Sequence, residues 1–116
     1  MLNHIVMMKF NPGVADARIR QLEHALDDLP NRIVEIQTYE FGPDVLHTDR
    51  SWDFALVSGF ANLEALQRYQ RHPAHQAVVA LLHELCARTA CVDFESKPLP
   101  INERDPVEDL LTMSRP

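Results

Sequence analysis

Glycine is scarce in this chain of 116 residues, which contains only Gly13, Gly42 and Gly59. Because these three glycines are isolated, the chain has no glycine-rich loop of the kind that holds the phosphates of a nucleotide. It also lacks a Gly-x-Ser-x-Gly sequence, the nucleophile elbow of many hydrolases. Phosphate-loop enzymes and elbow-type hydrolases are therefore not indicated by the sequence.

Basic residues are also fewer than acidic ones: the chain has 11 Lys and Arg and 17 Asp and Glu, which gives a net charge of -6. A protein that binds nucleic acid usually carries a basic stripe that neutralises phosphates, and no run of Lys or Arg is present. No apolar stretch is long enough to cross a bilayer, and residues 1–4 do not resemble the start of a signal peptide. We therefore expect no nucleic-acid partner, no membrane partner and a cytoplasmic location.

Cysteine is limited to Cys86 and Cys91. No Cys-x-x-Cys pair exists, so a zinc or redox site of that kind has no support. In a reducing compartment, two such cysteines are more often small buried hydrophobic residues than a disulfide. We expect both to fill the core.

The spacing of apolar residues divides the chain into two kinds of segment. Alternating spacing predicts strands over residues 2–10, 33–41, 51–60 and 89–95. Spacing of three and four predicts helices over residues 15–29, 63–70 and 73–86, with Asn62 as the N-cap of the second. Pro30 is expected to end the first helix, and Pro73 to break the second and begin the third.

This order of elements predicts an α+β domain with the ferredoxin-like β-α-β-β-α-β fold and a four-stranded antiparallel sheet. Helices would cover one face of the sheet. The other face would carry Ile5, Met7 and Val57, or their neighbours, which are too apolar to leave in water. We therefore expect a homodimer in which two sheets pack against each other.

Residues 96–116 differ in composition from the residues before them. They hold four of the eight prolines and begin with an extended linker sequence. Asp105 and Pro106 then suit the cap and first turn of a short amphipathic helix with one apolar side, made of Val107, Leu110, Leu111 and Met113. We expect a domain over residues 1–95 and a Pro-rich tail over 96–116 whose short helix docks on a surface.

Four separated segments occur in a distinctive order: His4-Ile5-Val6, Asp53-Phe54-Ala55-Leu56-Val57, the run from His72 to Val79, and Val92-Asp93-Phe94-Glu95. In that order they resemble the stress-responsive dimeric α/β-barrel (Dabb) family, over residues 3–95. The resemblance implies a homodimer whose two sheets close into one α/β barrel, with a pocket between the sheet and the helices of each protomer. The family includes plant stress-induced proteins and a plant polyketide cyclase that needs no cofactor or metal.

The resemblance also implies candidate site residues. In the cyclase, a histidine and a tyrosine of the His-Pro-Ala-His region serve aldol chemistry, and they match His75 and Tyr69 in this chain; the histidine of the first strand matches His4. A helix start and burial both disfavour the protonated form of His75, and a neutral imidazole suits a general base near neutral pH. A phenol at Tyr69 would donate to a carbonyl or a developing enolate.

Two functions remain open on these residues. One is a dimeric stress-responsive-type protein whose pocket binds a hydrophobic or aromatic carbonyl compound, with a cofactor-independent polyketide cyclase or isomerase as the catalytic alternative. The other is a protein without a reaction, in which His75 and Tyr69 only hold the helix break. If the protein is an enzyme, we expect a cofactor-free lyase, cyclase or isomerase. We expect His72 to face solvent or to cap a helix rather than to belong to the site. We expect no metal site, because Pro73 splits the two nearby histidines across the break.

Overall fold

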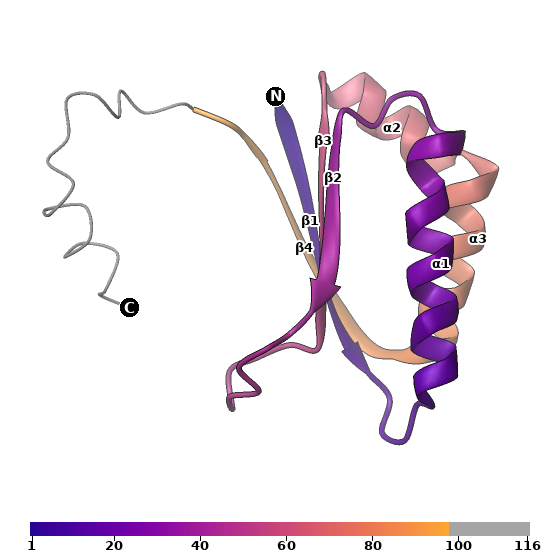
Figure 1. The fold of residues 1–116 in the computed structure, drawn as a ribbon. Helices are drawn as coiled ribbons and strands as arrows, with labels where there is room; N and C mark the ends of the chain where they lie inside the picture. Colours follow the sequence, from indigo (N-terminus) through magenta and orange to yellow (C-terminus); the bar gives the residue numbers. More distant parts are fainter. Residues whose placement is uncertain (98–116) are drawn as a thin grey trace, which may run out of the picture.

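The computed structural model of the protein describes residues 1–97. Its elements are β1 (Leu2–Phe10), α1 (Asp16–Arg32), β2 (Thr38–Pro43), β3 (Phe54–Phe60), α2 (Leu63–Arg71), α3 (Pro73–Leu85) and β4 (Cys86–Glu95). The four strands form one sheet in the order β2-β3-β1-β4, and all neighbouring strands are antiparallel. Figure 1 shows the helices together on one side of the sheet. The predicted ferredoxin-like fold is confirmed.

Helix α1 corrects the prediction that Pro30 ends the first helix, because α1 runs on to Arg32. A proline inside a helix removes one backbone donor, but the last turn here has other support. The Ile33 N–H donates to the Leu29 carbonyl over 2.9 Å, and the Arg32 guanidinium pairs with Asp28. Ile33 is also buried in the core, which anchors the end of the helix.

Strand β2 therefore begins later than predicted, at Thr38 instead of residue 33. Within it, Tyr39 and Phe41 are half-buried and pack against the core, while Thr38 and Glu40 are exposed. The prediction failed because residues 33–37 form a turn and a connection rather than a strand, so they do not fix the parity of β2.

The predicted bounds of the last two strands also need correction. Strand β3 begins at Phe54 rather than at residue 51, and β4 begins at Cys86 rather than at 89, directly after α3. Asp53 explains the first difference, because its carboxylate accepts the Phe10 N–H over 2.8 Å and its own N–H donates to the Met8 carbonyl. These contacts tie the residue before β3 to the end of β1 and end the regular ladder there.

The core lies between the helices and the sheet face that carries alternate residues of β1 and β3. His4 and Ser58 are the buried polar residues of this face among the described residues, and the apolar ones include Met8, Phe54, Leu56 and Phe60. The opposite parity points away from the helices and forms what we call the open face. It is apolar across three strands, with Ile5 paired to both Val57 and Val92, and it also carries Ala55, Met7, Ala90 and Phe94.

The predicted tail helix lies outside the described residues. Within residues 1–97, no helix has the length and apolar character that a bilayer span requires.

Candidate functional site

The break between α2 and α3 is built by His72 and Pro73, as the sequence predicted. Helix α2 ends at Arg71 and α3 begins at Pro73. Proline suits the first turn of a helix because it has no backbone N–H that would need a partner there. His72 caps α3, because its Nδ1 accepts the Ala74 N–H over 3.0 Å. The predicted capping role of His72 is thus confirmed, and the break brings the rings of Tyr69 and His75 into contact at an angle of 48°.

His75 lies in the first turn of α3 with its ring half-buried. Its Nδ1 lies 3.2 Å from the backbone carbonyl of Gln70. A carbonyl oxygen only accepts, so Nδ1 carries the proton and Nε2 keeps its lone pair in the neutral ring. Burial lowers the pKa of His75, opposed by the bond to Gln70 and assisted by the nearby His4 and His72. The neutral form expected from the sequence is therefore the favoured form.

Tyr69 lies in the last part of α2 and is only 1% exposed. Its ring centroid is 4.3 Å from that of His75, 4.9 Å from that of Phe60 and 6.3 Å from that of His4. Burial raises the pKa of Tyr69 to about 12, so its hydroxyl remains a protonated donor at neutral pH. Tyr69 thus forms the packed centre between the two imidazoles.

His4 is buried on β1, where its Nδ1 lies 2.5 Å from Oδ1 of Asp93 on the neighbouring β4. The register explains the contact, because His4 and Asp93 are directly paired and their side chains lie on the same face. A carboxylate accepts the Nδ1 proton and fixes the ring orientation, which leaves Nε2 for another partner. Asp93 is therefore a positioning residue for His4.

A pocket of about 270 Å³ lies between α3 and strands β1 and β4. Its apolar side chains include Val6, Val79 and Leu82, and its polar lining consists of His4, Gln70, His75, His83, Thr89 and Cys91. An engineered apolar cavity of roughly 150 Å³ holds benzene. The pocket is therefore large enough for an aromatic ring with a substituent. His4 and His75 line it, whereas Tyr69 packs behind them.

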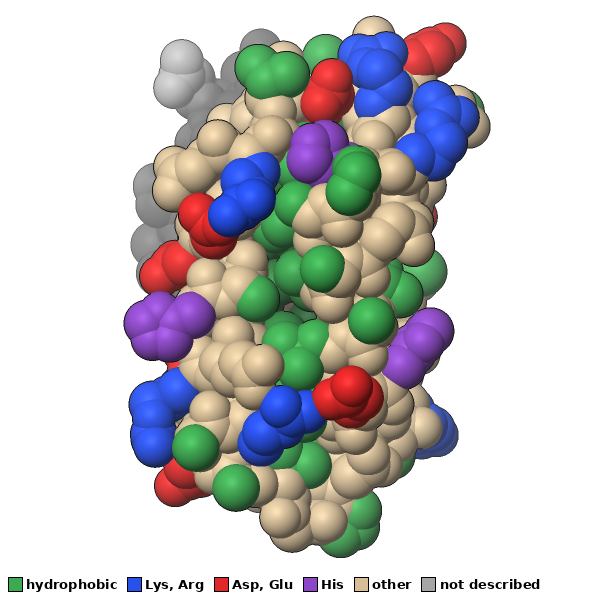
Figure 2. Space-filling model, turned by 90° about the vertical axis from the view of Figure 1, so that its right-hand side faces the viewer, with side chains coloured by type: hydrophobic (Ala, Val, Ile, Leu, Met, Phe, Trp, Pro, Cys, Tyr) green, Lys and Arg blue, Asp and Glu red, His purple; other side chains and the backbone are tan. Residues whose placement is uncertain are grey.

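A larger groove, about 530 Å³, lies between α1 and α3 on the outer side of the helices. Figure 2 faces this side and shows a hollowed apolar floor between charged side chains. Alanines form much of that floor, and the Arg18–Glu84 and Arg32–Asp28 pairs lie along it. None of the candidate site residues lines the groove. The smaller pocket is the stronger candidate because both His4 and His75 line it.

The structure therefore gathers the three residues singled out from the sequence, and it adds residues that the sequence did not single out. Asp93 belongs to the closing strand, and its pairing with His4 places its side chain on the pocket side. Cys91 corrects the expectation that both cysteines fill the core, since it is exposed and lines the pocket, while Cys86 packs half-buried against the core.

A metal centre has no donor set in residues 1–97, where no group of three or more His, Cys, Asp or Glu side chains is placed to hold an ion. Histidines at positions 72 and 75 are instead committed to the backbone groups described above.

Comparisons with known proteins converge on one family. The family described as Stress responsive A/B Barrel Domain matches residues 2–96. An uncharacterized protein of Streptomyces coelicolor is 34% identical over 97 residues, which cover 82% of this chain and 99% of the relative.

Solved structures give the same result for the fold. A dimeric ferredoxin-like protein of unknown function from Thermobifida fusca is 30% identical with a TM-score of 0.76, covering 82% of this chain and 90% of that chain. A dimeric protein of unknown function with a ferredoxin-like fold from Bacteroides fragilis is 31% identical with a TM-score of 0.72, covering 82% of this chain and 95% of that chain.

Proposed function

The chain belongs to the stress responsive A/B barrel domain family, and we propose that it is a homodimer whose pocket binds a small hydrophobic or aromatic carbonyl compound. The observation that carries the proposal is the state of His75. Its Nδ1 is held by the Gln70 carbonyl, and the ring lines a pocket of about 270 Å³. A fixed neutral imidazole with a free Nε2 is the arrangement that a general base requires.

The homodimer is supported by the open face and by the two relatives described as dimeric. Met7, Val92 and Phe94 are all exposed on that face. An apolar face of this kind is stabilised when a second sheet covers it. The two sheets would then face each other, with the helices and the pockets on the outside, in agreement with the α/β barrel implied by the sequence.

The chemistry that this site supports is cofactor-free proton transfer next to a carbonyl. His75 Nε2 takes a proton from the carbon beside the carbonyl, and the C–H electron pair becomes the enolate. The Gln70 carbonyl stabilises the positive charge that the ring gains, because it accepts from Nδ1. His4 lines the pocket and donates to the oxygen from Nε2 when its ring carries both protons, with Asp93 holding Nδ1. Tyr69 packs behind the two imidazoles and holds them in place. Return of the proton to another carbon gives an isomerase, and attack of the enolate on a second carbonyl gives a cyclase.

The test measures directly how fast the carbon next to the carbonyl loses its proton. The protein is incubated in D₂O with a panel of small ketones, including an aromatic one such as acetophenone, and loss of the proton next to the carbonyl is followed by ¹H NMR. We expect exchange above the buffer rate, and we expect His75→Ala to lower it by about a hundredfold or more. His24→Ala is the matched control, since His24 is an exposed histidine of α1 that does not line the pocket. Exchange that is equal in the wild type and in His75→Ala would overturn the catalytic assignment.

A second function, binding without a reaction, is favoured by the tight packing of Tyr69 against His75 and by the bond of His75 to Gln70. These contacts also hold the helix break. Under this function, carbonyl compounds shift the amide signals of pocket residues in NMR titrations, but none exchanges its protons. If no compound shifts those signals, the three residues are architectural and the carbonyl-binding proposal fails.

A further inference from the structure

The loop between β2 and β3, residues 44–53, leaves the sheet on the side of the open face. Figure 1 shows it bending away from the helices below the ends of both strands. A segment on that side is not buried by the helices or by the core of its own chain. The loop can therefore contact a molecule that packs against the open face.

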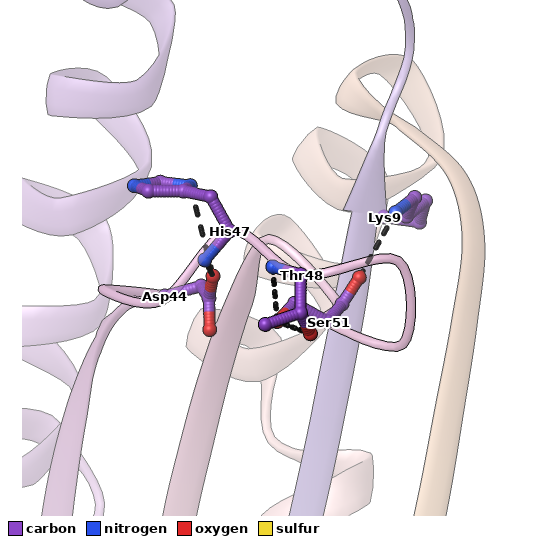
Figure 3. Close-up of polar contacts among 5 residues, drawn as sticks. All are labelled: Lys9, Asp44, His47, Thr48 and Ser51. Carbon is purple, nitrogen blue, oxygen red and sulfur yellow. Dashed lines mark hydrogen bonds and ion pairs between the residues drawn. The ribbon is translucent and has the colours of Figure 1, made fainter.

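Local hydrogen bonds fix the shape of the loop (Figure 3). The Asp44 carboxylate accepts the His47 N–H over 2.6 Å, and His47 adopts a positive φ of 54°. The Ser51 N–H donates to the Thr48 carbonyl over 3.0 Å, and the Ser51 hydroxyl accepts the Thr48 N–H over 3.1 Å. Lys9, at the end of β1, donates to the Ser51 carbonyl over 3.0 Å. The loop therefore has a defined conformation and is attached to the sheet by a hydrogen bond.

Within this built loop, two adjacent aliphatic side chains point into solvent. Val45 is 81% exposed and Leu46 is 77% exposed. Removing such an aliphatic side chain from water in a contact stabilises that contact. Both residues are held by the Asp44–His47 turn that encloses them, so little additional ordering is needed when a contact forms.

A hollow of about 170 Å³ lies where the loop meets the open face. It is lined by Met7 and Ala55 of the open face and by Pro43, Asp44 and Trp52 beside the loop. The loop and the open face therefore form one continuous surface with a recess. Its size suits an aliphatic or aromatic side chain from another molecule.

We propose that the loop over residues 44–53 is part of the contact between two copies of this chain, with Val45 and Leu46 packing on the partner. The inference rests on the proposed homodimer through the open face and adds a second contact to it. A second copy is the occupant because the surface is continuous with the face that pairs the sheets. Two-fold symmetry makes the contact occur twice, once with the loop of each chain, so the dimer buries four aliphatic side chains.

The test measures self-association of the full chain by sedimentation velocity over a range of concentrations. We expect the double variant Val45→Ser/Leu46→Ser to raise the dimer dissociation constant by about a hundredfold or more. Val34→Ser is the matched control, because Val34 is 88% exposed and lies before β2, at the end opposite the loop. It should leave the dissociation constant unchanged. Circular dichroism checks that each variant is folded.

Direct contact is tested in dimers that mix ¹³C-labelled with unlabelled chains. Isotope-filtered NOEs are expected from the methyl groups of Val45 and Leu46 to the partner, and none from Val34. A wild-type chain that stays monomeric would refute the homodimer itself. A dimeric wild type whose affinity is unchanged in the double variant, with no NOE from the loop, would refute the loop contact and leave the homodimer intact.

Discussion

Nδ1 of His4 lies 2.5 Å from Oδ1 of Asp93, across the pairing of β1 with β4. The contact joins the floor of the pocket to an edge strand and holds one imidazole in a single orientation. It also makes the pocket depend on a carboxylate that is distant from His4 in the sequence. A second imidazole, that of His75, is held by a backbone carbonyl instead.

Replacing the carboxylate at Asp93 is expected to weaken the site without unfolding the protein. In Asp93→Asn, an amide replaces the charged acceptor of the His4 Nδ1 proton, so the ring loses its fixed orientation. We expect ketone proton exchange to fall about tenfold, which corresponds to about 1.4 kcal/mol, and its pH profile to change.

Glu95→Gln provides the control for Asp93→Asn. Glu95 lies two residues along the same strand, is exposed and contacts the N-terminal ammonium at 3.8 Å. It should leave both the rate and the pH profile unchanged. If Asp93→Asn matches the wild type in both, Asp93 does not position His4 for function.

The lowered pKa of His75 gives an activity profile that extends to acid pH. A general base works when it is deprotonated, and the folded pKa of His75 lies below its ordinary value of 6.5. Exchange should therefore keep more than half of its full rate at pH 6.5 and fall to half only at a lower pH. Rates measured from pH 4.5 to 8.5 check this, and a midpoint above pH 6.5 would contradict the role of burial.

The same pKa shift links stability to pH. Above pH 6.5, His75 is neutral in both the folded and the unfolded chain, so its titration contributes nothing to the free energy of unfolding. Below pH 6.5, the unfolded chain binds the proton more readily than the folded chain, so wild-type stability is lost as pH falls through this range. His75→Asn removes that penalty. The stability difference between wild type and variant should shrink between pH 7.5 and pH 5 in urea unfolding; a constant difference would contradict the shift.

The two tyrosines are expected to tolerate loss of the hydroxyl, whereas loss of the Tyr69 ring should be costly. The Tyr39 hydroxyl is buried and has no hydrogen-bond partner in the described structure, and burial raises its pKa. Tyr39→Phe should therefore be neutral or stabilising by up to about 1 kcal/mol. Tyr69→Phe keeps the ring packing behind the two imidazoles and should change exchange and stability little, whereas Tyr69→Ala should cost roughly 3–5 kcal/mol. Urea unfolding and ketone exchange, measured on all three variants, separate packing from chemistry.

A charge on the open face is expected to dissociate the homodimer. Phe94 is 47% exposed there, and Phe94→Glu would place a carboxylate between two apolar sheets without a partner. We expect a monomer at micromolar concentration in sedimentation velocity. The outer groove offers the control, because Ala80→Glu adds the same charge to the helical side. A Phe94→Glu chain that stays dimeric would refute packing through the open face.

The sequence predicted the order of elements and the three residues that meet at the helix break. It succeeded there because Pro73 and the periodicity around it act locally, and because the buried parity of β1 carries His4 to the same side as the helices. Pro30 misled the prediction, since the sequence does not show that Ile33 would be buried and that Arg32 would pair with Asp28.

Asp93 and Cys91 were missed for a different reason. Both belong to edge strand β4, in which most residues of either face are exposed, so burial does not distinguish the face that lies under the helices. Their place in the pocket follows only from the pairing of β4 with β1, a contact between the two ends of the described domain. Long-range pairing of this kind leaves no local signal. The volume of the pocket likewise depends on how α3 packs over the sheet.

The proposal that the pocket binds a carbonyl compound is tested most directly by a crystal structure of the dimer grown with an aromatic ketone. We expect the ring among Val6, Val79 and Leu82, with its carbonyl oxygen about 2.7–3.2 Å from Nε2 of His4 and the neighbouring carbon facing His75 Nε2. A pocket that stays empty of ketone at saturating concentration, or is filled by protein side chains, would contradict it.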